Sequence, residues 1–146
     1  MRYEGSTEIV AHVTDVWNAL VDPHQMSTCM PGLVTWHEVK ENKIFQLMVS
    51  WGMDNTPQVN IPIRIIWESL NASKSMVIVG ETAVNQLPIY TKATITLTPI
   101  ETAITTLAFK AEITTPNRMM DRLVHTAVPP LIAKFFKCLK HTIENS

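Results

Sequence analysis

The chain of 146 residues is poor in glycine, cysteine and charged residues: it has four glycines, two cysteines, and charged side chains at only 17% of positions. Its formal net charge is −1, so bulk electrostatics do not attract it to a polyanion such as nucleic acid. The first residues lack the apolar segment of a secretory signal, and no apolar run is long enough to cross a bilayer. We therefore expect a cytoplasmic protein with no membrane span and no nucleic-acid partner.

The two cysteines, Cys29 and Cys138, lie far apart and show none of the short paired spacings of a zinc site. We expect both to be reduced thiols. Cys29 fits either a nucleophile beside a base or a small buried residue in a structural turn, and the sequence offers no oriented base. His24 and His37, taken with Cys29, match no familiar ligand spacing, so the expectation is no metal and no cofactor.

Signatures of catalysis are also missing. The acidic residues are scattered, with no Ser-His-Asp order, paired carboxylates or phosphate-binding loop, and we assign no catalytic residue. Arg64 and Glu81 lie in strand-like segments. Either side chain needs a partner or water if it enters an apolar cavity, and an orientation toward solvent is the commoner one for charged residues.

What the sequence does contain is material for a core. Hydrophobic residues make up 46% of the chain, and its length suits one continuous domain over residues 1–146. Several segments are rich in Val, Ile and Thr, and residues 91–97 alternate between polar and apolar side chains, as in a sheet with one covered face. Strands are predicted at 3–10, 33–39, 43–51, 61–70, 75–81, 88–98 and 103–114. Their short links favour an antiparallel meander.

Helical patterns occur near both ends of the chain. Thr14 is the predicted cap of a short first helix. After Pro116 an apolar stripe at spacings of three and four predicts a long helix that faces the sheet, with basic residues such as Lys140 on its solvent side. The stripe consists of Met120, Leu123, Val124, Ala127, Leu131, Phe135 and Leu139. Pro129-Pro130 predicts a kink in this helix or two helices in succession.

The stretch DPHQMSTCMPG, residues 22–32, predicts a structural elbow in which Pro23 begins a short helix and Pro31-Gly32 ends it. The order of elements resembles the helix-grip SRPBCC superfamily, which is related to START lipid-binding domains. Four features more narrowly resemble the CoxG family of carbon monoxide dehydrogenase. They are Glu4-Gly5-Ser6, Val16-Trp17 with Leu20, Asp22-Pro23, and Cys29-Met30-Pro31-Gly32 leading into Leu33.

This resemblance implies an α+β helix-grip fold: a curved antiparallel sheet of about seven strands around the long C-terminal helix, with two short helices after the first strand. It also implies an apolar cavity between sheet and helix. The residues expected to bind a ligand there are Trp17, Met30, Trp67, Ile78, Ile95, Phe109, Met120, Leu123 and Ala127.

The implied function is non-catalytic carriage of an apolar, quinone- or lipid-like molecule, with a molybdenum hydroxylase such as carbon monoxide dehydrogenase, or its maturation factors, as protein partner. Two alternatives stay open: a cyclase- or aromatase-like enzyme that acts within the cavity, and an interaction module whose pocket is filled by its own side chains. Inward-facing His, Asp, Glu or Arg would favour the enzyme, and an apolar lining would favour carriage.

Overall fold

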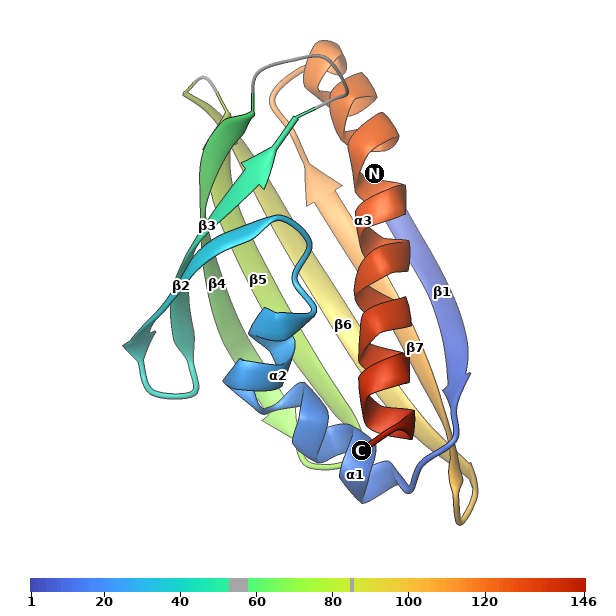
Figure 1. Cartoon of the computed structure of the whole chain (residues 1–146). Helices are drawn as coiled ribbons and strands as arrows, with labels where there is room; N and C mark the ends of the chain where they lie inside the picture. The colour runs from blue at the N-terminus through green and yellow to red at the C-terminus, as the bar shows by residue number, and fades with distance from the viewer. Residues whose placement is uncertain (53–57, 85) are drawn as a thin grey trace.

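The computed structural model describes residues 1–52, 58–84 and 86–146. Along the chain, the elements are β1 (Arg2–Ile9), α1 (Val13–Leu20), α2 (Pro23–Thr28), β2 (Leu33–Lys40), β3 (Ile44–Trp51), β4 (Val59–Asn71), β5 (Ser75–Val84), β6 (Leu87–Glu101), β7 (Ile104–Thr114) and α3 (Arg118–Glu144). The strands form one sheet in the order β1-β7-β6-β5-β4-β3-β2, and α3 runs along one face of it (Figure 1). The predicted antiparallel sheet wrapped around the last helix is confirmed.

Each strand pairs antiparallel with its neighbour, and the first strand pairs with the last one through residues such as Gly5 and Phe109. Side chains alternate between the two faces, so Ile61, Ile63, Ile65 and Trp67 of β4 all point toward α3. Strands β4, β5 and β6 extend beyond their predicted ends, because their hairpin ladders continue almost to the turns. The core face is set by this alternation.

The two short helices lie at one end of the sheet, near the C-terminus of α3 (Figure 1). The prediction that Thr14 caps α1 is wrong: the cap is His12, whose Nδ1 accepts a hydrogen bond from the Thr14 amide at 3.2 Å. The cap of α2 is Asp22, whose carboxylate accepts from the His24 amide at 2.9 Å, with Pro23 in the first turn as predicted.

Gly32 ends the elbow in a conformation that other residues rarely adopt. Its φ is +72°, and an added Cβ would lie 2.5 Å from the Ser50 carbonyl oxygen. The Gly32 carbonyl in turn accepts from the Ser50 amide at 2.7 Å. Pro31-Gly32 therefore turns the chain into β2 and fixes it beside β3, which is the structural role that the sequence predicted.

Helix α3 is continuous from Arg118 to Glu144, so the alternative of two successive helices is wrong. Pro129 and Pro130 lie inside it and lack the amides that would pair with the carbonyls of His125 and Thr126. Both of those residues are exposed, so water can bond to the freed carbonyls. No helix in the described part of the chain is both long and apolar enough to cross a bilayer.

A disulfide joins Cys29, at the C-terminal end of α2, to Cys138 of α3. The two Cα atoms lie 5.5 Å apart although the cysteines are 109 positions apart in sequence. The prediction of two reduced thiols is therefore wrong. The interpretation of Cys29 as a free nucleophile is also wrong for this form of the protein, because its sulfur is bonded to that of Cys138. Sequence distance misled the prediction because the elbow and the last helix are brought together only by the tertiary fold.

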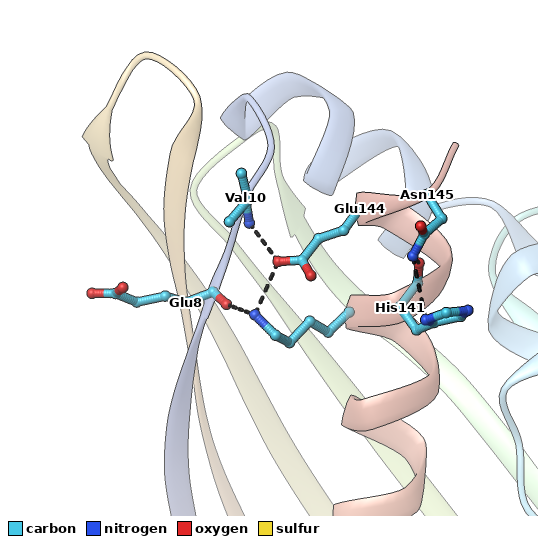
Figure 2. A network of polar contacts seen from close by, with 6 residues as sticks. Glu8, Val10, His141, Glu144 and Asn145 are labelled. Atoms are coloured by element: carbon cyan, nitrogen blue, oxygen red, sulfur yellow. Dashed lines mark hydrogen bonds and ion pairs between the residues drawn. The ribbon is translucent and has the colours of Figure 1, made fainter.

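Polar contacts hold the C-terminal end of α3 to the end of β1 (Figure 2). The Glu144 carboxylate accepts from the Val10 amide at 2.8 Å and pairs with the Lys140 ammonium at 2.9 Å, and Lys140 also donates to the Glu8 carbonyl. The pKa of Glu144 is lowered, mostly by the hydrogen bond from the Val10 amide and to a smaller extent by the hydrogen bond from Lys140. Lys140 was predicted to lie on the solvent side of the helix, and its side chain is 39% exposed while it makes these contacts.

Buried side chains form two separate clusters. The larger one lies beneath α1 and α2 and includes Leu20, Phe45, Leu107, Leu139 and Ile143. The smaller one lies under the N-terminal end of α3 and consists of Ile89, Ile113, Met120 and Val124. Helix α3 thus packs against the sheet at both ends.

Candidate functional site

A pocket of about 350 Å³ lies between the middle of α3 and the sheet. A second pocket of about 200 Å³ adjoins it toward the N-terminal end of α3. The two have in common the lining residues Pro31, Val49, Ile63, Thr91, Ile113, Val128 and Leu131. They therefore form neighbouring parts of one space, which we call the central pocket.

The central pocket lies where the sheet has short side chains. Ala93 of β6 pairs with Ala111 of β7, and both line the pocket. One step along, Gly80 of β5 pairs with Thr91 of β6. Because α3 is packed at both ends, its middle cannot descend onto these small residues. The space thus results from the register of β5, β6 and β7, which places small residues next to one another on the face toward α3.

Large apolar and aromatic residues form the other walls. Phe45 packs between Trp36 and Trp67, with ring centroids 5.0 and 4.7 Å apart, and the two tryptophans line the pocket. On the opposite side, Phe109 of β7 stacks on Phe136 of α3 at 4.6 Å. Met26, Met30 and Pro31 of the elbow line the end near the short helices. Methionines here give a wall that can adapt its shape.

No charged side chain and no histidine lines the central pocket among the described residues. Its hydroxyl-bearing side chains are Ser50, Thr82 and Thr91. Ser50 donates to Gln58 at 2.9 Å, and Thr82 donates to the Pro62 carbonyl at 2.6 Å. The lining therefore offers an apolar molecule a mainly apolar surface but supplies no ionisable group for proton transfer.

The charged residues that were candidates for the cavity lie elsewhere. Arg64 and Glu81 are exposed and occupy paired positions on β4 and β5, on the face turned away from α3. In residues 1–52, 58–84 and 86–146, no three His, Cys, Asp or Glu side chains come together in a way that could hold a metal ion.

The structure places most of the predicted ligand-binding residues on one surface. Met30, Trp67, Ile78, Ile95 and Phe109 line the larger part of the central pocket. Met120, Leu123 and Ala127 line the smaller part. Trp17 does not line it: α1 lies at the end of the sheet, and Trp17 is buried in the larger core cluster with its neighbours Val16 and Leu20.

The sequence analysis missed several lining residues that share a face with those it named. They are Met26, Trp36, Val49, Ile63, Ile65, Thr91, Ala93, Ala111, Ile113, Val128, Leu131, Ile132, Phe135 and Phe136. For the strands the signal was available, because steps of two from Trp67, Ile95 and Phe109 reach Ile65, Ala93 and Ala111. Leu131 and Phe135 already belonged to the predicted stripe of the last helix, so the same kind of signal was available for them. The elbow residue Met26 and the other helix residues needed the tertiary arrangement.

The model of the carbon monoxide dehydrogenase CoxG family matches residues 5–144. The chain belongs to the CoxG family. All four features that suggested this family from sequence lie within the match, except for Glu4, which precedes it by one residue. None of the curated proteins matches the sequence.

Solved structures share the fold of this CoxG-family chain. A conserved protein from Geobacillus kaustophilus is 20% identical with a TM-score of 0.88, over 100% of this chain and 97% of that one. The ZhuI aromatase/cyclase from Streptomyces sp. R1128 is 11% identical with a TM-score of 0.76, over 99% and 93%. A norcoclaurine synthase point mutant from Thalictrum flavum, solved with a transition-state analogue, is 12% identical with a TM-score of 0.69, over 98% and 93%. The predicted helix-grip fold is thereby confirmed.

Proposed function

We propose that this protein is a non-catalytic carrier that binds an apolar, quinone- or lipid-like small molecule in the central pocket. The observation that supports this most strongly is the lining itself. Trp, Phe, Ile, Met and Ala side chains predominate in it, and none of the described residues that line the pocket has an ionisable side chain. Affinity would come from removing apolar ligand surface from water, at roughly 25 cal/mol per Å². The pocket also has the size expected for a small-molecule site.

The lining argues against the two alternative functions. A cyclase-like enzyme needs polar groups placed against its substrate, and the described lining has hydroxyls but no acid or base. An interaction module with a self-filled pocket would bring large side chains over Ala93 and Ala111, where the structure instead has a space of about 350 Å³. Carriage is the function that fits both observations.

The partner that we propose is a molybdenum hydroxylase such as carbon monoxide dehydrogenase, or one of its maturation factors. Membership of the CoxG family supports this partner. Pull-down with purified carbon monoxide dehydrogenase, in the presence and absence of ligand, tests the partner separately from the ligand.

A titration tests the carrier function directly. Tryptophan fluorescence is a suitable readout, because Trp36 and Trp67 line the pocket. A quinone series and a fatty-acid series of increasing apolar length should bind more tightly with length until the pocket is full, and should raise the melting temperature in parallel.

Two substitutions on one strand provide the matched comparison. Ala111→Leu adds volume on the pocket face of β7, and Ala108→Leu adds the same volume on the opposite face of that strand. The proposal expects Ala111→Leu to weaken binding of the longest ligand at least tenfold and Ala108→Leu to leave it unchanged, with roughly 1.4 kcal/mol per tenfold. If no member of either series binds the wild-type protein, the carrier function is wrong.

A further inference from the structure

The central pocket contains a polar position at its midpoint. Thr91 lies on the inward face of β6 and lines both parts of the pocket, between the apolar walls of the larger part and those of the smaller part. Its strand neighbours are Gly80 and Ile113, neither of which has a polar side chain. An added Cβ on Gly80 would lie 3.7 Å from the Thr91 Cβ, so the glycine leaves room beside the threonine.

The Thr91 hydroxyl differs from the other hydroxyls of the pocket. Ser50 and Thr82 use theirs to donate to Gln58 and to the Pro62 carbonyl. The Thr91 hydroxyl has no hydrogen-bond partner among the residues that the structure describes. No described side chain has a fully buried nitrogen or oxygen atom without a partner, so this hydroxyl is open to the space that it lines. Thr91 therefore brings a hydroxyl donor with no described partner to the lining of the central pocket.

We infer that Thr91 determines specificity by donating a hydrogen bond to a neutral oxygen, a ketone or quinone-type carbonyl, in a ligand with apolar groups on both sides of it. This inference rests on the proposed carrier function. A carboxylate fits the position poorly, because no cationic side chain among the described residues lines the pocket to compensate its charge. A wholly apolar molecule binds less well, because it strips water from the Thr91 hydroxyl and returns no hydrogen bond.

Three probes of equal chain length separate these cases: a dialkyl ketone with its carbonyl near the middle, the corresponding alkane, and the corresponding fatty acid. Affinities are measured by tryptophan fluorescence and checked by native mass spectrometry. The wild-type protein should bind the ketone roughly three- to tenfold more tightly than the alkane, the range of one net hydrogen bond. The fatty acid should bind more weakly than the ketone.

Variants of Thr91 identify the donor. Thr91→Val keeps the shape of the side chain without the hydroxyl and should remove the preference for the ketone, whereas Thr91→Ser keeps the hydroxyl and should retain the preference. Thr94→Val, on the opposite face of the same strand, is the control and should change neither affinity.

The outcomes distinguish this inference from the function on which it rests. If ketone and alkane bind equally to the wild type, or if the ketone preference survives in Thr91→Val, the assignment to Thr91 is wrong while the carrier function stands. If none of the three probes binds the wild type, the carrier function itself fails. Urea unfolding of each variant shows whether an affinity has been lost through unfolding.

Discussion

The C-terminal end and the middle of α3 belong to one helix but pack against the sheet in opposite ways. At the end, Leu139 and Ile143 are buried in the larger core cluster, and the disulfide and the Glu144 contacts fix the helix to α2 and β1. In the middle, Leu131 and Phe135 are only half-buried and face the central pocket. The difference shows how a helix fixed at its ends can lie above a sheet without filling the space between them.

The strand sequences explain why the two regions differ. Beneath the packed end the sheet presents Leu97 and Leu107, which are buried, whereas beneath the middle it presents Ala93 and Ala111. Alanine side chains end at Cβ. The paired alanines Ala93 and Ala111 therefore leave more space between the sheet and α3 than a pair of leucines would. Tight packing and the central pocket thus lie in different regions of the helix, and substitutions in each should behave differently.

Loss of the disulfide should have one of the largest effects on the packed end. It closes a loop of 109 residues, so replacing both cysteines in Cys29→Ser/Cys138→Ser should lower the free energy of unfolding by about 4 kcal/mol. Urea unfolding with and without reductant measures this. Reductant should destabilise the wild type to the level of the variant and leave the variant unchanged. A wild type indifferent to reductant would contradict the link between α2 and α3.

Truncations to alanine should separate the two regions next. Leu139→Ala leaves a cavity in a fully buried site and should cost about 3–5 kcal/mol, whereas Phe135→Ala enlarges a space that already exists and should cost about 2 kcal/mol. Chemical denaturation of both variants gives the comparison. Equal costs would mean that Phe135 is as tightly packed as Leu139 and that the middle of the helix is not raised over a pocket.

Enlargement of alanines should give the reverse pattern with smaller effects. Ala19→Leu overfills the packed core under α1 and should destabilise the protein by about 1–3 kcal/mol. Ala111→Leu enters the central pocket and should cost less than about 1 kcal/mol. Thermal unfolding of the two variants without ligand measures the contrast, which would be lost if the pocket were already full.

The smallest effect concerns pH at the end of α3. The pKa of Glu144 is lowered in the folded protein by the Val10 amide and Lys140, so its ionised form stabilises the fold above the ordinary glutamate pKa. That contribution is lost as the pH falls through the lowered pKa. Glu144→Gln should therefore be less stable than wild type at neutral pH and equal to it in strong acid. Glu101→Gln, in the β6–β7 turn region, serves as the exposed control. A stability difference that persists in acid would exclude this origin.

Much of the fold followed from local patterns. Alternation in the strands, the stripe after Pro116 and the Pro-Gly elbow predicted the sheet, the last helix and their order, because each depends on residues close in sequence. Eight of the nine residues named for the ligand site line the central pocket. Seven of them lie on strands or on α3, where position on a face is a local property, and Met30 lies in the elbow.

The errors share a different cause. The disulfide between Cys29 and Cys138 and the burial of Trp17 away from the pocket both depend on how α1, α2 and α3 meet in space. The depth of the pocket depends on register, which pairs Ala93 with Ala111. Neither the way the helices pack together nor the register in which two strands pair can be predicted from a periodic sequence pattern alone.

Native mass spectrometry of the purified protein beside the double variant Ala93→Leu/Ala111→Leu tests the central claim most directly, since these two alanines line the pocket. After loading with the ligand that binds most tightly in the titrations, the wild type should carry one bound molecule that solvent extraction removes, and the folded double variant should carry none. A wild type that stays at its bare mass under all loading conditions, or a double variant that retains the same molecule, would contradict the account of a raised helix over a binding pocket.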